Sequence, residues 1–338
     1  MRRLSVAVVQ GGPSTEAEVS RASAAGVARA LADTGHAVVR LELDAFVAES
    51  LRTGGFDVVF PVVHGAVGED GSLQGLLEVL DLPYVGSGVV ASALGMSKHL
   101  ARVLFAQAGL PVAQAIVARR GPGGFAAAHE AAERARREVG ARVVVKPSSH
   151  GSAIGVARLE GDASTAEVAR AIEQVWEIDE VALVEHFAKG REVTCGVLEG
   201  LEGEAARALP PTEILAPSDA FYSFEARYAS GRSVHICPAQ LGDAGARVAR
   251  VQEIALSAHR VLGCRDLSRA DFVVGDVGAP EAVTLLEVNT LPGMTATSLF
   301  PEAAAVAGWA MPELCDGLVQ RAHRRYRPRT SNAKPLPR

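Results

Sequence analysis

Four polar side chains occupy alternate positions in two short apolar runs near the C-terminus. The first run carries Arg269 and Asp271. The second carries Glu287 and Asn289. Because the side chains of a strand alternate between its two faces, each pair shares one face. The segment 275–280 between the runs has the glycine, aspartate and proline content of a turn, which predicts an antiparallel hairpin.

Such a hairpin would gather one cation and three oxygen-bearing groups on a single patch. Carboxylate and amide oxygens of this kind suit Mg²⁺ that is shared with substrate phosphates. The opposite face of the hairpin should hold the apolar side chains Phe272, Leu286 and Val288. A half-solvated strand pair with ordinary surface charges fits the same pattern, so the hairpin by itself leaves both interpretations open.

A loop of small residues, 148–155, follows a predicted strand that ends at Lys146. Its serines and glycines would let backbone N–H groups approach phosphates closely, and the lysine would complement their negative charge. The residue order of a Walker loop is absent. An ordinary flexible turn explains this composition as well. An ordinary solvated side chain likewise explains Lys98, the lysine at the start of a predicted helix earlier in the chain.

Two further segments mix aromatic and charged residues. The segment 185–192 joins two predicted strands. It would suit a hinge in which backbone groups read adenine, Phe187 packs against the base and Glu192 receives the ribose hydroxyls. A charged turn between strands is the alternative. The segment 221–228 is either a core strand or, given its proline, serine and glycine neighbours, a mobile loop.

The first third of the chain predicts alternating strands and helices. Apolar runs typical of buried strands lie at 4–9, 37–43 and 56–63. Leucines at helical spacing predict a helix at 70–80. The stretch Thr15–Glu18 has capping-box spacing and predicts a helix from there to about Ala32, although its acidic residues are also favourable simply at a helix N-terminus. The pattern indicates a doubly wound parallel sheet that ends near residue 95.

The chain as a whole predicts an α/β protein whose C-terminal half is α+β. Further helices are expected from 98 to about 108, at 125–139, after Ser164, at 244–262 and after Pro312, and further strands at 142–146, 180–185 and 192–198. We predict an N-terminal domain of residues 1–96, a central domain of 97–185, a C-terminal domain of 186–325 and a disordered tail of 326–338.

Composition places the protein among ordinary globular chains. It has 338 residues, 48% of them hydrophobic, and its net charge of −5 argues against nucleic-acid binding. The arginines from 321 to 329 fit a solvated helix end before the tail. Four scattered cysteines fit a reduced compartment, and no apolar stretch suits a signal peptide or a membrane span. We therefore expect a cytoplasmic protein with no nucleic-acid or membrane partner.

Taken in order, these segments resemble the D-alanine–D-alanine ligase family of ATP-grasp enzymes. The matching stretches, between about residues 4 and 320, are GGPSTEAEVS, FPVVHGAVGEDGSLQGLLEVLDLPYVGSG, ALGMSKHLAR, VVVKPSSHGSAIGV, VEHFAKGREVT, FYSFEARY, ICPA, LGCRDLSRADF and LLEVNTLPGMTATSLFP. The resemblance implies a three-domain ATP-grasp fold. It also implies that ATP phosphorylates the carboxylate of one D-alanine, and that the amine of a second D-alanine attacks the acyl phosphate.

The resemblance further implies a role for each candidate residue. Residues expected to bind ATP are Lys98, Lys146, Glu185, Phe187, Glu192 and Arg227. Two Mg²⁺ ions, which Mn²⁺ could replace, would be held by Asp271, Glu287 and Asn289. Residues expected to bind the two D-alanines are Glu16, His64, Ser298 and the amide of Leu299. Arg269 and the N–H of Gly293 would stabilise the tetrahedral oxyanion, and the set Glu16, Ser152 and Tyr228 would orient the second amine.

Three positions depart from the family pattern. His150-Gly151-Ser152-Ala153 stands where Glu-Gly-Ser-Ser is common, Arg227 replaces a frequent lysine, and Phe187 replaces a common tryptophan. Two alternatives stay open: a sister ligase with D-lactate or D-serine as its second substrate, and an ATP-binding regulator that has lost catalysis. The complete metal-ligand set with Arg269 argues against the regulator. The resemblance also allows a homodimer.

Overall fold

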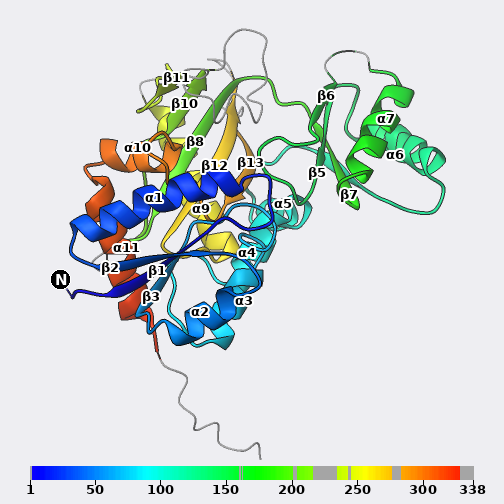
Figure 1. Ribbon diagram of the computed structural model, residues 1–338. Coiled ribbons are helices and arrows are strands. Elements are labelled where there is room, and N and C mark those ends of the chain that lie inside the picture. Colours follow the sequence, from blue (N-terminus) through cyan, green and yellow to red (C-terminus); the bar gives the residue numbers. More distant parts are fainter. Residues whose placement is uncertain are drawn as a thin grey trace, which may run out of the picture.

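Three β-sheets, each packed against helices, form the described part of this computed structural model (Figure 1). The structure describes residues 2–159, 161, 163–200, 204–215, 234–242, 245–275 and 283–327. The predicted loop 221–228, with Arg227 and Tyr228, therefore lies outside the described residues. In Figure 1 the second sheet and its helices project as a lobe to the right, while the first and third sheets lie together.

The first sheet is parallel, in the order β2-β1-β3, and consists of β1 (Ser5–Gln10), β2 (Ala37–Glu42) and β3 (Val58–Pro61). Its helices are α1 (Ala17–Asp33), α2 (Val47–Thr53) and α3 (Ser72–Val79). Alternate side chains of β1 enter two different apolar clusters, one with α1 and the other with α2 and α3. Helices thus cover both faces, and the predicted doubly wound parallel sheet is confirmed.

Two local predictions in this region were wrong. Strand β2 has no fully buried residue, because it forms the edge of the sheet; half of its residues are exposed and the other half are only partly buried. The capping box at Thr15–Glu18 is not formed. The N-cap of α1 is Glu16 rather than Thr15, its side chain makes no capping hydrogen bond, and the carboxylate of Glu18 pairs with Arg21.

The second sheet is antiparallel, in the order β4-β7-β5-β6. Its strands are β4 (Ala115–Arg119), β5 (Val143–Pro147), β6 (Ala157–Leu159) and β7 (Val181–His186). Helices α6 (Phe125–Glu138) and α7 (Thr165–Trp176) pack on one face. Ser164 caps α7 in a capping box with Glu167, as predicted. Helices α4 (Val89–Met96), which the sequence did not predict, and α5 (Lys98–Gln107) connect the first sheet to the second.

The third sheet has the order β11-β10-β8-β12-β13, with β9 paired to β8. Its strands are β8 (Arg191–Leu198), β9 (Arg207–Ala208), β10 (Thr212–Leu215), β11 (Val234–Ile236), β12 (Leu267–Val274) and β13 (Val283–Asn289). The remaining helices are α9 (Ala246–Leu262), α10 (Leu299–Val306) and α11 (Met311–Arg325). α9 packs on one face of this sheet with side chains of β8, β12 and β13.

A shared apolar cluster joins the first and third sheets. It combines residues of β1, β3 and α1 with Leu198, Leu267, Phe300 and several residues of α11. The second sheet has a separate cluster with α6 and α7. Among the described residues, no single helix is long and apolar enough to span a membrane; the pair α4 and α5 passes that test only jointly and is bent by 102°.

Candidate active site

A cleft of about 500 Å³ collects most of the predicted site residues. The predicted residues in its lining are Glu16, His64, Ser152, Glu192, Arg269, Asp271, Glu287, Asn289, Gly293, Ser298 and Leu299. They come from all three parts of the chain, so the fold brings together residues up to 283 positions apart (299 minus 16). Lys98 adjoins the cleft through its contact with Glu287. Lys146 and Glu185 lie on the second sheet, and Phe187 lies beside Arg158 at the edge of that sheet.

The predicted hairpin forms from β12 and β13. Arg269 lies opposite Asn289, and Asp271 lies opposite Glu287. Arg269 binds Asp271 with both ends of its guanidinium, at 2.7 Å and 2.8 Å, and Thr194 donates to the same carboxylate at 2.8 Å. One cation and three oxygen-bearing side chains therefore share a face, as the spacing predicts.

Leu286 does not lie on the apolar face of the hairpin, contrary to prediction. The register shifts after Asp271, so that Phe272 pairs with Leu285 and Leu286 has no partner on β12. This β-bulge places two consecutive residues, Leu286 and Glu287, on the cleft side. Strict alternation cannot anticipate an extra residue in one strand.

Lys98 connects the hairpin to the loop of small residues. Its Nζ lies 3.3 Å from Oε2 of Glu287 and donates to the carbonyl of His150 at 2.5 Å. The backbone N–H of Lys98 donates to the carbonyl of Ser148 at 2.9 Å. The start of α5 therefore fixes the base of the loop beside the carboxylates.

The chemistry of the hairpin suits a divalent cation that takes further oxygen ligands from a substrate. Asp271 and Glu287 are hard anionic donors, and Asn289 offers Oδ1, which also accepts from the N–H of Leu291 at 2.9 Å. No group of three or more Asp, Glu, His or Cys residues with metal-binding geometry occurs within the described residues. Two carboxylates and an amide are a donor set that phosphate oxygens can complete.

The second sheet contributes a buried ion pair to the nucleotide side. Lys146 on β5 lies 2.6 Å from Oε2 of Glu185 on β7, and both side chains are almost fully buried. Arg102 on α5 approaches the other oxygen of Glu185 at 3.8 Å. These charges lie on the face away from α6 and α7, since Val143, Val145 and Val184 point toward those helices.

Ser152 and Glu16 join the loop to the first sheet. The serine hydroxyl donates to Oε1 of Glu16 at 2.5 Å, and both residues are buried. Ser152 and Ala153 both have positive φ, at 51° and 58°, which is unfavourable for residues with a Cβ. This unfavourable backbone conformation occurs where the Ser152 hydroxyl contacts Glu16 at the N-terminus of α1.

His64 lies in the same corner, beside Glu69, which the sequence analysis missed. Nδ1 of His64 is 4.0 Å from Glu69, and the buried Nε2 makes no hydrogen bond with any described residue. Burial would lower the pKa of His64, but Glu69 and, more weakly, Glu16 outweigh burial and raise the pKa above its ordinary 6.5. The only signal for Glu69 was its place in the motif stretch after His64.

The opposite end of the cleft is the N-terminus of α10. Ser298 is the N-cap residue, and its Oγ accepts from the N–H of Thr295 at 3.0 Å. Leu299 begins the helix, so its amide is one of those that no intrahelical carbonyl can satisfy. A Cβ on Gly293 would lie 2.9 Å from Oγ of Ser298, which explains the glycine there. Amides and a hydroxyl at a helix start suit a carboxylate.

A second charged region, here called the anchor cluster, consists of Glu199, Asp266, Arg321 and Arg325. Asp266 is 0% exposed and accepts hydrogen bonds from the N–H of Gly86 at 2.7 Å and from both arginines. Glu199 accepts from Arg321 and from the N–H of Asp266. The prediction of a solvated helix end was therefore wrong for both arginines, because buried carboxylates require a counter-charge.

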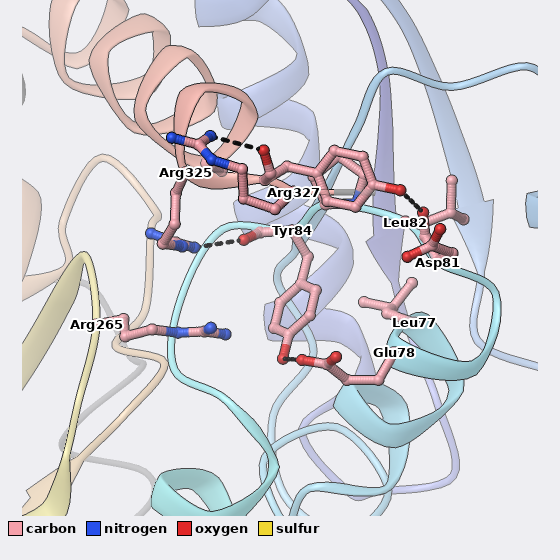
Figure 2. Close-up of a pocket in the computed structure, with 11 residues that line it drawn as sticks. Leu77, Glu78, Asp81, Leu82, Tyr84, Arg265, Arg325 and Arg327 are labelled. Carbon is pink, nitrogen blue, oxygen red and sulfur yellow. Dashed lines mark hydrogen bonds between the residues drawn. The ribbon is translucent and has the colours of Figure 1, made fainter. Parts of the chain in front are cut away.

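A cavity of about 180 Å³ adjoins the anchor cluster (Figure 2). Tyr84 lies in its wall, with Arg265 over its ring at 5.1 Å and its hydroxyl donating to Glu78 at 2.9 Å. Tyr326, the first residue of the expected tail, donates to the carbonyl of Asp81 at 2.8 Å. None of the predicted site residues lines this cavity, so the candidate active site is the cleft.

Fold and cleft together define an ATP-grasp protein. The loop of small residues that follows β5 and the carboxylate hairpin of the third sheet both line the cleft, and Lys98 contacts both. Two family models match the chain, the D-ala D-ala ligase N-terminus over residues 44–87 and the D-ala D-ala ligase C-terminus over residues 104–320.

Individual relatives agree over almost the full length. A D-alanine–D-alanine ligase of Gluconobacter oxydans is 43% identical over 325 residues, covering 94% of this chain and 99% of that protein. Among solved structures, the D-alanine–D-alanine ligase of Coxiella burnetii has a TM-score of 0.78 at 27% identity and covers 96% of this chain and 95% of its own. The Bacillus anthracis enzyme complexed with ATP has a TM-score of 0.75 at 26% identity, covering 95% and 98%. The chain belongs to the D-alanine–D-alanine ligase family.

Proposed function

We propose that this protein joins two D-alanines to D-alanyl-D-alanine, with ATP as co-substrate, and so supplies a peptidoglycan precursor. ATP phosphorylates the carboxylate of the first D-alanine. The amine of the second then attacks the acyl phosphate, releasing phosphate. Membership of the family over nearly the full length supports this activity.

The observation that carries the proposal at the level of residues is the contact between Ser152 and Glu16. These residues are 136 positions apart, yet the hydroxyl and the carboxylate are 2.5 Å apart at the wall of the cleft. We assign Glu16, with His64 beside it, to the ammonium of the first D-alanine. Ser152, held in place by its hydrogen bond to Glu16, would orient the second amine together with Tyr228.

The nucleotide would lie between the second and third sheets. We assign Lys98 and Lys146, with Arg227, to the phosphates, and Glu185 and Glu192 to the nucleoside. Two Mg²⁺ ions, or Mn²⁺ in their place, would neutralise charge on the transferred phosphoryl group. The residues that would hold them are Asp271, Glu287 and Asn289, which fit because their oxygens leave positions for phosphate ligands.

Arg269 and Gly293 are the proposed oxyanion stabilisers. Arg269 lies two residues before Asp271 and faces the cleft, and Gly293 lines the same cleft. A fixed guanidinium and a backbone N–H stabilise charge that develops on a carbonyl oxygen during amine attack. Ser298 and the Leu299 amide would hold the second carboxylate at the start of α10.

A phosphate-release assay tests the function. With ATP, Mg²⁺ and D-alanine the protein should release phosphate, and mass spectrometry should identify D-alanyl-D-alanine. L-alanine should not replace D-alanine. Release that depends on D-lactate, with a depsipeptide as the main product, would assign the chain to a sister ligase. ATP binding without any release would instead indicate a regulator.

We further propose a cytoplasmic homodimer. ATP is available in the cytoplasm, and the surface of α3 to α5 offers an apolar face for a second copy. Val79, Val90 and Val103 are 78%, 70% and 55% exposed there, and none of the exposed residues between 82 and 109 is charged. Sedimentation should find a dimer, and Val90→Asp should shift it toward a monomer.

A further inference from the structure

Arg158 adjoins the cleft through Glu192, which lines it, although no role has been assigned to Arg158. It is the central residue of β6, the edge strand of the second sheet, and pairs with Val144, which in turn pairs with Glu185 on β7. Directly opposite residues share a face of a sheet. Arg158 and Glu185 therefore lie in one row on the face away from α6 and α7, the face assigned to ATP.

Two contacts connect Arg158 with residues beyond its own sheet. Nη2 of Arg158 donates to Oε1 of Glu192 at 2.9 Å, and Glu192 is on β8 of the third sheet. The guanidinium also lies over the ring of Phe187 at 5.6 Å from its centroid. One side chain thus contacts Glu192 and Phe187, two of the residues expected to bind the nucleoside, and it connects the second sheet to the third.

We propose that Arg158 is a positioning residue that prepares Glu192 and Phe187 for the nucleoside of ATP, and that it thereby helps to select a ribonucleotide. The inference rests on the proposed function. Its chemical basis is the pairing of a planar cation with a carboxylate and an aromatic ring.

The hydrogen bond to Glu192 sets the orientation of the carboxylate. A charge-assisted hydrogen bond from the guanidinium fixes the position of Oε1. Oε2 is then held in one direction, where it can accept from the ribose hydroxyls. Without Arg158, the side chain of Glu192 would sample several rotamers and would have to be ordered when ATP binds.

The stacking on Phe187 orders the ring in a similar way. The guanidinium covers one face of the ring and leaves the other face for a base. Phe187 stands where tryptophan is common in the family, so the aromatic area available for stacking is smaller. A cation packed behind the ring holds the remaining area in place.

Direct measurement of nucleotide affinity separates these effects. Isothermal titration with ATP and with 2′,3′-dideoxyATP should be performed on wild type, Arg158→Ala, Arg158→Lys and Glu192→Gln. Arg170→Ala is the matched control, since Arg170 is exposed on α7 behind the same sheet. Thermal melting of each variant confirms that it folds.

Arg158→Ala should weaken ATP binding about tenfold, the order expected for a hydrogen bond to a charged group. It should weaken 2′,3′-dideoxyATP binding less, so the preference for the ribonucleotide should shrink. Arg158→Lys should fall between wild type and alanine. In the Glu192→Gln background, removing Arg158 should no longer change the preference. At saturating ATP, kcat with D-alanine should stay near wild type, because Arg158 acts on KM for ATP.

Equal weakening for both nucleotides would overturn the inference, because Arg158 would then act without the ribose contact. Tighter ATP binding in Arg158→Ala would also overturn it, since the side chain would then only obstruct the site. A wild-type protein that binds no ATP would overturn the proposed function as well. D-alanine-dependent phosphate release with an unchanged nucleotide preference in Arg158→Ala would overturn this inference alone.

Discussion

The cleft and the anchor cluster both combine basic side chains with carboxylates, but they enclose their charges differently. In the anchor cluster, Asp266 is 0% exposed and accepts from Gly86, Arg321 and Arg325. In the cleft, the side chains of Asp271 and Glu287 are 19% and 26% exposed and border a cavity of about 500 Å³.

The difference shows what separates a structural charge cluster from a chemical one. The roughly four acceptor positions of a carboxylate are taken up at Asp266 by one amide and two guanidinium groups, so no ligand can be added. Its backbone also has a positive φ of 62°, which fixes its direction. In the cleft, ion pairs such as Lys98–Glu287 and Arg269–Asp271 instead surround a space that a substrate can enter. We therefore expect substitutions in the cleft to change activity, and substitutions in the anchor cluster to change stability.

The largest effect on activity should come from Glu287→Gln. The substitution keeps the shape of the side chain and removes the charge that is paired with Lys98 and proposed to bind metal. Turnover should fall about a thousandfold or more, because several kcal/mol of charge stabilisation are lost. The melting temperature should stay within about 2 °C of wild type. Near-normal turnover at ordinary Mg²⁺ would remove Glu287 from the proposed metal site.

The opposite outcome is expected for Asp266→Asn. Asparagine tolerates the positive φ of Asp266 and keeps its size, so only the charge is lost. Two arginines would lose their buried partner, which should cost about 3 kcal/mol of unfolding free energy in chemical denaturation. At low temperature, where the variant remains folded, kcat should be close to wild type. A stable variant that has lost activity would break the proposed division between the two regions.

Acid should weaken the anchor cluster through Glu199. Burial would raise the pKa of Glu199, but His259 at 3.8 Å, the N–H of Asp266 and Arg321 lower it to about 2, well below the ordinary 4.5. A depressed pKa gives stability that is present above pH 4.5 and is lost as the pH falls toward 2. Glu199→Gln should cost about 2 kcal/mol at pH 7. The difference from wild type should shrink below pH 4.5, and a difference that is constant with pH would contradict this account.

Much of the fold could be predicted from local sequence signals. The cap of α7 at Ser164, the three strands of the first sheet and the antiparallel hairpin of β12 and β13 each depend on residues close together in the chain, and each is present. The errors have other causes. Thr15–Glu18 has the spacing of a capping box, but α1 starts one residue later with Glu16 as its N-cap, and the carboxylate of Glu18 binds Arg21 instead.

The candidate site divides in the same way. The pairing of Asp271 with Glu287 follows from strand periodicity, while the bulge at Leu286 does not. Arg158 has no signal in the sequence and Glu69 only its place in the motif stretch after His64, because their importance depends on contacts with Glu192 and His64 that the fold creates. The run of arginines at the end of α11 was equally ambiguous in the sequence, where it predicts a solvated helix end. Only the structure shows that Arg321 and Arg325 bind the buried Asp266.

The smallest expected effect concerns His64, a buried imidazole in the cleft, whereas the four residues of the anchor cluster include no histidine. His64 has a raised pKa because Glu69, helped by Glu16, outweighs the effect of burial. A raised pKa in the folded state gives stability that is fully present below the ordinary 6.5 and is lost as the pH rises through the folded value.

In Glu69→Gln the main stabilising charge is gone and burial remains, so the pKa of His64 should fall. An NMR titration of the imidazole should detect this directly. Denaturation between about pH 5.5 and 8.5 should show that wild type loses stability as the pH rises, whereas the variant lacks this slope. Glu49→Gln is the control, because Glu49 pairs only with the exposed Arg52 among the described residues. If His64 titrates identically in wild type and Glu69→Gln, Glu69 does not set its charge, and the cleft would resemble the anchor cluster in holding fixed charges only.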